Sequence, residues 1–144
     1  MKRVALGLAL ILAASGCLSL LEPADLQGTW LATSLVLTEA DNLDNSVDIL
    51  DESDVAALEF TFDLNIYQSR VVGLDGVEEL FEDEYILDGS FITFFNFRGE
   101  EETRFGIEID NETTMRLNDP VTEWDLDGDG EDDLVIMDVF LRRQ

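Results

Sequence analysis

The stretch DGSFITFFNF, residues 88–97, gives the clearest indication of the fold. Asp88-Gly89 is a strong hairpin signal, because a tight turn between two strands needs residues that tolerate positive φ angles. After this turn the side chains alternate between two faces: Phe91, Thr93, Phe95 and Phe97 on one, Ile92 and Phe94 on the other. A period of two is typical of a β-strand, so the stretch predicts a hairpin followed by a strand.

The same pattern recurs along most of the chain. "ALEFTF" places Leu58, Phe60 and Phe62 on one face, and "TRFGIEI" alternates Phe105, Ile107 and Ile109 with Arg104 and Glu108. Strands are predicted over 28–38, 57–62, 66–72, 77–87, 90–97, 103–109, 114–119 and 133–143. Segment 77–87 is more polar, and it fits either an exposed strand or a short helical turn. We expect Glu39–Asp54, with seven acids and no base, to form a long loop. The near-hairpin spacing predicts an all-β fold, an eight-stranded antiparallel meander closed into a barrel.

The start of the chain, MKRVALGLALILAASGC, reads as an export signal. Two basic residues precede an apolar stretch from Val4 to Ala14, which is too short to span a bilayer. The ending ASGC resembles a bacterial lipobox, although Ala14 stands where Leu is most often found. The resemblance implies a signal peptide of residues 1–16 and lipidation of Cys17 with acyl chains such as palmitate. The alternative is an ordinary secretory signal cleaved after Ala14 or Gly16, which would leave a free thiol.

The lipobox divides the chain into three parts: the signal peptide, a lipidated cysteine with its tether at 17–27, and a β-barrel domain at 28–144. Leu18 follows the cysteine, with no Asp there to indicate inner-membrane retention. Similarity to lipoproteins of diderm bacteria therefore implies an anchor in the outer membrane.

The charge is strongly acidic, with 33 Asp and Glu against 8 Lys and Arg. Removal of residues 1–16 leaves six arginines and no lysine, a net charge of −27. Such a surface repels nucleic acid and anionic lipid, so we expect neither as a partner. Two explanations for this charge are open: adaptation to salt or divalent cations, and binding of a basic partner. We favour adaptation, because the acids are spread along the whole chain. We expect a monomer.

The sequence also argues against an enzyme. It contains no His, which excludes Ser-His-Asp and Cys-His arrangements and the usual zinc sites. The mature chain has no lysine for a Schiff base, and its one cysteine is assigned to lipid. Paired carboxylates could hydrolyse glycosides, but nothing distinguishes one pair from another.

The motif LQGTW, Leu26–Trp30, resembles the start of lipocalin-like domains, where a short turn precedes a first strand bearing Gly-x-Trp. The resemblance implies that Trp30 closes the base of the barrel and that an arginine near the last strand packs over it. Arg142 or Arg143 matches by position, and Arg142 is the residue we predict. The alternative is that Trp30 is simply a core aromatic.

The segment DLDGDGEDD, 125–133, is a candidate ion site because it holds six acids in nine positions. Ca²⁺ takes six to eight oxygen ligands, which a loop supplies from alternate positions. Asp125, Asp127, Asp129 and Asp133 offer carboxylates, Glu131 offers its backbone carbonyl, and a glycine permits the sharp turn. The alternative is a solvated acidic turn.

This loop resembles an EF-hand-type loop through nine positions and then departs from it. Ile136 stands where a bidentate Glu would be, and the residues that follow are strand-like. The loop is in this respect similar to the calcium turns of integrin-type β-propeller repeats. Loss of one ligand predicts one weak Ca²⁺ site, with a Kd of about 10⁻⁴ to 10⁻³ M.

These observations predict a lipid-anchored, calcium-stabilised binding protein of the cell envelope. Its resemblance to lipocalins implies a small apolar ligand in the barrel. The alternative is a structural or protein-interaction lipoprotein with a packed core that holds no ligand. A cavity above about 300 Å³ would favour the binding protein.

Overall fold

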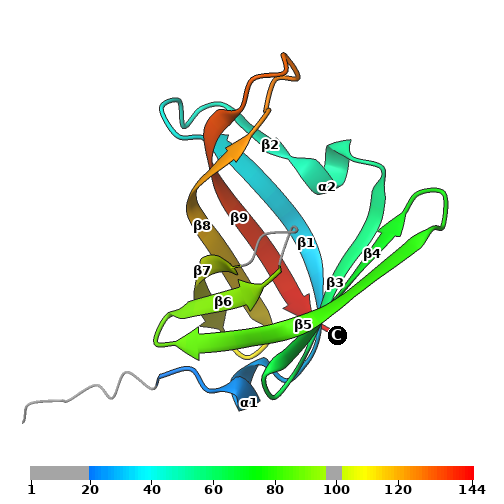
Figure 1. Ribbon diagram of the computed structural model, residues 1–144, viewed down its shortest axis with the longest axis vertical. Coiled ribbons are helices and arrows are strands. Elements are labelled where there is room, and N and C mark those ends of the chain that lie inside the picture. Colours follow the sequence, from blue (N-terminus) through cyan, green and yellow to red (C-terminus); the bar gives the residue numbers. More distant parts are fainter. Residues whose placement is uncertain (1–19, 97–101) are drawn as a thin grey trace, which may run out of the picture.

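The computed structural model describes residues 20–96 and 102–144, and their strands form one antiparallel sheet that closes on itself (Figure 1). Strands neighbouring in sequence pair with each other from β3 to β9, and β1 pairs with both β3 and β9. The strands are β1 (Gly28–Glu39), β2 (Ser46–Asp48), β3 (Val55–Asp63), β4 (Ile66–Gly73), β5 (Glu78–Asp88), β6 (Phe91–Phe95), β7 (Glu102–Asp110), β8 (Thr114–Trp124) and β9 (Asp133–Arg143). Eight of them make the barrel, which confirms the predicted meander, and β2 adds a short outer strand along β1.

Two short helices complete the described part of the chain: α1 (Pro23–Leu26), before β1, and α2 (Ile49–Glu52), between β2 and β3. Neither helix is long and apolar enough to cross a membrane. In Figure 1, α1 lies at one end of the barrel, and the β1–β2, β4–β5 and β8–β9 connections lie at the other. We call these the base and the open end.

Strand β1 changes partners along its length. Its first residues, Gly28–Leu31, pair with β3, and Trp30–Glu39 pair with β9. The register with β9 shifts between Ala32 and Ser34, which marks a β-bulge. A bulge increases the local bend of a strand, which helps one long strand to close the barrel.

The predicted loop 39–54 is partly ordered, contrary to expectation, because Asp48 ties it to β1. The Asp48 carboxylate accepts hydrogen bonds from the Ser34 hydroxyl (2.5 Å) and the Leu35 N–H (3.1 Å), and it also caps α2 through the Leu50 N–H (3.1 Å). Burial alone would raise the pKa of Asp48, but these hydrogen bonds outweigh it and hold the pKa below its ordinary value. Segment 77–87, which fitted either an exposed strand or a short helical turn, forms a strand, β5.

The lower and middle interior is filled by aromatic and aliphatic side chains. Phe94 lies at its centre, with its ring centroid 4.6 Å from that of Tyr67 and 5.8 Å from that of Phe105. On β6 the inward residues are Ile92 and Phe94, both fully buried, whereas Phe91 on the other face is 43% exposed. The alternation predicted for 90–96 is therefore confirmed, and Phe97 lies outside the described residues.

Candidate functional site

Trp30 closes the base of the barrel. Its side chain is fully buried, and its indole N–H donates a hydrogen bond to the carbonyl of Leu26 at 2.8 Å. Leu26, the last residue of α1, is itself fully buried, so α1 forms part of the folded base although it falls within the predicted tether 17–27. A buried indole needs such an acceptor, because an unpaired N–H would be costly in an apolar surrounding.

Arg143 covers Trp30, and the prediction of Arg142 is wrong. The guanidinium carbon of Arg143 lies 4.4 Å from the Trp30 ring centroid. Its nitrogens donate to the carbonyls of Asp25 and Gln27 (both 2.6 Å) and of Glu112 (2.8 Å). Arg142 is exposed, because side chains alternate along β9 and Arg143 shares the inward face with Leu141.

The open end results from unequal strand lengths. Strand β6 pairs with the last residues of β5, Tyr85–Asp88, and within the described part of the chain the stretch Glu78–Glu84 pairs with β4 alone. The register puts Val71, Glu79 and Phe81 on the face of this hairpin that looks into the barrel, since neighbouring inward positions include the buried Phe60 and Ser69. Phe81 is 38% exposed, and its ring lies 6.0 Å from that of the buried Tyr67.

A cleft of about 630 Å³ occupies this inner face at the tip of the hairpin. Its lining combines apolar groups with three acids: Asp54, Val71, Gly73, Leu74, Asp75, Val77 and Glu79. We call it the hairpin cleft. A cleft of similar volume, about 640 Å³, lies at the base against α1, where the donors of Arg143 already bind backbone carbonyls.

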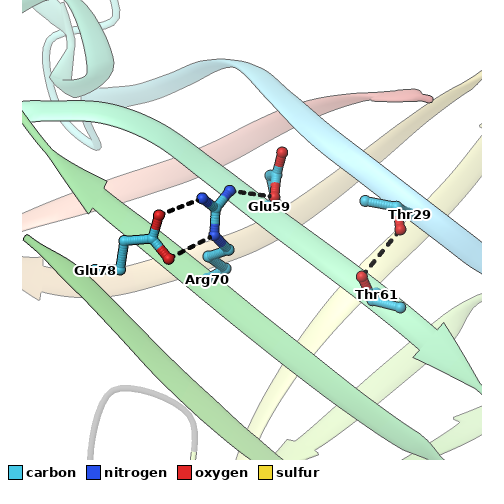
Figure 2. Close-up of polar contacts among 5 residues, drawn as sticks. All are labelled: Thr29, Glu59, Thr61, Arg70 and Glu78. Atoms are coloured by element: carbon cyan, nitrogen blue, oxygen red, sulfur yellow. Dashed lines mark hydrogen bonds and ion pairs between the residues drawn. The ribbon is translucent and has the colours of Figure 1, made fainter. Parts of the chain in front are cut away.

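The two faces of the β3–β4–β5 sheet differ in charge pairing, and Figure 2 shows the outer face. On the outer face Arg70 binds Glu59 at 2.9 Å and Glu78 at 2.6 Å, and its hydrogen bonds hold the pKa of Glu78 below the ordinary value. Thr29 and Thr61 continue this outer polar surface, with their hydroxyls 3.1 Å apart. Within the described residues, no arginine makes a salt bridge to the acids of the hairpin cleft.

The predicted calcium loop brings three of its acids together. One carboxylate oxygen from each of Asp125, Asp127 and Asp129 lies within 4.8 Å of the others. Backbone amides of the loop hold the Asp125 carboxylate: the N–H groups of Gly128 and Gly130 donate to its two oxygens at 2.7 and 3.0 Å. Gly130 has a φ of 90°, which a residue with a side chain would adopt only with strain.

The other two predicted ligands lie differently. Asp133 accepts a hydrogen bond from the Leu126 N–H at 3.2 Å, and Glu131 donates its N–H to Asp129 at 2.8 Å. Each carboxylate oxygen that accepts one bond retains a second lone pair for a cation. The donor set therefore suits a hard, oxygen-seeking ion, and Asp125, Asp127 and Asp129 are the residues whose geometry fits it best.

Sequence reasoning missed the hairpin cleft. Leu74 lies within the predicted turn GLDG and Val77 directly follows it, and both are largely exposed, at 70% and 58%. Apolar residues beside a solvent-facing turn were the available signal. The signal peptide 1–16 and Cys17 lie outside the described residues.

Neither a protein-family model nor a curated protein matches the sequence. Solved structures do match it. A lipocalin-like protein from Bacteroides uniformis ATCC 8492 aligns with a TM-score of 0.54 at 18% identity, over 83% of this chain and 99% of that one. An uncharacterized protein from Bacteroides eggerthii DSM 20697 gives a TM-score of 0.51 at 15% identity, with the same coverage of both chains. The chain therefore has a lipocalin-like β-barrel fold: the strand pattern predicts the barrel, and the resemblance at LQGTW implies its lipocalin-like form.

Proposed function

We propose that this protein is a lipid-anchored binding protein of the cell envelope that takes a small apolar ligand at the open end of its barrel. The observation that carries the proposal is the hairpin cleft, about 630 Å³ in volume, on the inner face of a barrel whose other end is closed by Trp30 and Arg143. Ligand sites in proteins commonly have volumes of about 300 to 1,000 Å³ and mix apolar walls with a few polar groups.

Because the core is packed, the ligand is expected to bind at the open end and not deep inside the barrel. Phe60, Phe94 and Phe105 are at most 1% exposed, and they fill the middle of the interior. Above them the inward face includes three buried polar residues, Ser69, Thr103 and Asp119, beside the buried Val135 and Met137. Apolar surface open to solvent begins again at Phe81 and Val77, where a ligand can bind without displacing the core.

Anchoring and calcium complete the proposal. The lipobox-like ASGC supports lipidation of Cys17 and, with Leu18 after it, placement in the outer membrane. The described chain begins at the base, beside α1, so an anchor there would leave the open end directed away from the membrane. Convergence of the Asp125, Asp127 and Asp129 carboxylates supports one Ca²⁺ in the β8–β9 loop.

The packed core also supports a second candidate, a structural or protein-interaction lipoprotein. The neutral fluorophore N-phenyl-1-naphthylamine distinguishes the two, because its emission rises on entry into an apolar site. A binding protein gives a saturable, one-to-one increase, which Val71→Trp abolishes by filling the hairpin cleft. Val72→Trp is the matched control, since Val72 is the neighbouring residue on the outer face of β4.

Folding of each variant is checked by far-ultraviolet circular dichroism. If Val71→Trp fails to fold, Val77→Asn replaces it, because Val77 lines the same cleft but is 58% exposed. Absence of saturable binding to the unmodified protein would favour the interaction lipoprotein.

A further inference from the structure

We propose that the ligand is an amphipathic cation: an apolar chain or ring carrying an ammonium group, held in the hairpin cleft. This inference rests on the proposed function and adds the chemical class of the ligand. The apolar part would lie along Val71 and Val77, and the ammonium group would lie among Asp54, Asp75 and Glu79.

The lining of the cleft suits such a molecule. Three of its seven lining residues are acids, and three others are the aliphatic residues Val71, Leu74 and Val77. Aliphatic residues exposed to solvent at a cleft favour an apolar occupant, because its binding removes their surface from water. Acids in the same cleft favour a positive charge on that occupant.

Local hydrogen bonds fix the carboxylate of Asp75 and the backbone of Asp54. Asp75 accepts a hydrogen bond from the Val77 N–H at 3.0 Å, which turns its carboxylate back over Gly73. A Cβ at Gly73 would lie 2.6 Å from an oxygen of Asp75, so only glycine leaves this space for the carboxylate. The carbonyl of Asp54 accepts a hydrogen bond from the Leu74 N–H at 2.8 Å, which fixes the α2–β3 junction against the hairpin.

The charge asymmetry of the hairpin is the strongest argument. On its outer face Arg70 pairs with Glu59 and Glu78, so one positive charge offsets part of the negative charge of these two acids (Figure 2). On the inner face no arginine of residues 20–96 and 102–144 makes a salt bridge to Glu79. Negative charge beside an apolar wall attracts cations and repels anions. A fatty-acid anion is therefore a poor ligand, although its chain would fit.

The apolar wall continues toward the core. Phe81 is the next inward residue of β5 after Glu79, and its ring contacts that of the buried Tyr67, with 6.0 Å between centroids. An apolar tail that starts near Val71 can therefore extend along Phe81. The exposed face of an aromatic ring also attracts an ammonium group by a cation–π interaction.

Three probes of equal chain length test the charge requirement: octyltrimethylammonium, octanol and octanoate. Each is titrated against N-phenyl-1-naphthylamine bound to the full chain, and displacement of the dye is measured with all probes kept below their micelle concentrations. We expect the cation to bind at least tenfold more tightly than octanol, and octanoate to give no displacement. The double variant Asp54→Asn with Glu79→Gln should reduce the preference for the cation to threefold or less.

The matched control is Glu82→Gln with Glu84→Gln, which removes the same charge from the outer face of β5 and should leave the preference unchanged. Equal binding of octanol and the cation would overturn the inference and leave the proposed function standing. An equal loss in the control variant would also overturn it, because the preference would then reflect net charge. Absence of naphthylamine binding would overturn the inference together with the proposed function.

Discussion

Arg143 stacks on Trp30, with 4.4 Å between the guanidinium carbon and the ring centroid, and three carbonyls accept hydrogen bonds from the same guanidinium. The carbonyls belong to the two sides of the base: Asp25 and Gln27 at α1, and Glu112 at the β7–β8 turn. One side chain thus joins the N-terminal helix, the first strand and a distant turn. The base is held together by this contact as well as by apolar packing.

Replacement of this arginine should therefore destabilise the barrel. We expect Arg143→Ala to lower the free energy of unfolding by about 2 to 4 kcal/mol, since it removes a cation–π contact and leaves three carbonyls without their donor. Arg142→Ala, one residue away on the exposed side of β9, should change it by less than about 0.5 kcal/mol. Urea denaturation measures both values. Equal losses in the two variants would contradict the assignment of Arg143.

A second stability prediction concerns Phe94, whose fully buried ring contacts those of Tyr67 and Phe105. Phe94→Ala should cost about 3 to 5 kcal/mol, because it leaves a cavity at the centre of the core. Phe91→Ala on the opposite face of β6 is the matched control and should cost about 1 kcal/mol, mainly through the lost contact with Arg104, whose guanidinium carbon lies 4.1 Å from the ring. A small shift of the urea midpoint in Phe94→Ala would contradict this prediction, because it would mean that removal of the ring does not destabilise the core.

Strand alternation predicted much of this arrangement. Leu58, Phe60 and Phe62 share the inward face of β3, and Ile92 and Phe94 share that of β6, because a strand with one buried face must repeat every second residue. The same alternation identifies the arginine that faces inward on β9. Val139 and Leu141 are buried, so Arg143 continues their face and Arg142 does not.

The hairpin cleft could not be predicted in the same way. β5 has eleven residues and β6 only five, so among the described residues no strand pairs with the first part of β5 on the side opposite β4. Pairing lengths depend on contacts between strands, whereas alternation is a property of one strand. The order within 39–54 is non-local too, since it rests on hydrogen bonds from Ser34 and Leu35 to Asp48.

Alkaline pH should weaken the fold through two tyrosines. Burial, reinforced by the negative charge of Asp63, raises the pKa of Tyr85 to about 12, and burial with the charge of Asp83 raises the pKa of Tyr67. In the unfolded chain a tyrosine titrates near pH 10. The unfolded state therefore loses its protons first, so the stabilisation is complete below pH 10 and is lost as the pH rises toward 12.

The urea midpoint measured between pH 9 and pH 12 tests this, with tyrosinate absorbance recorded in parallel. Tyr85→Phe should make the alkaline decline less steep, because one of the two titrating groups is removed. A midpoint that stays constant up to pH 12 in the unmodified protein would show that burial does not suppress tyrosine ionisation.

Calcium should stabilise the protein through the β8–β9 loop. We expect a single site with a Kd of about 10⁻⁴ to 10⁻³ M and a melting temperature that rises with Ca²⁺. Asp127→Asn with Asp129→Asn should abolish both effects. The matched control, Asp41→Asn with Asp44→Asn, removes the same charge near the β1–β2 connection and should retain them. Calorimetric titration and thermal unfolding with and without chelator give the two readouts. Equal stabilisation by any salt would assign the effect to general screening of the acidic surface.

The lipid anchor is tested by three substitutions at two adjacent residues. Cys17→Ser should abolish incorporation of labelled palmitate and release the protein from the membrane fraction, because no thiol remains to be acylated. Leu18→Asp should retain the label and move the protein from the outer to the inner membrane, whereas Leu18→Ser should stay in the outer membrane. Thermal unfolding should be unchanged in all three, since both positions precede in sequence Leu21, the first residue that packs against the described core. Persistent labelling of Cys17→Ser would place the acyl chain elsewhere. An unlabelled but secreted protein would favour the ordinary signal peptide.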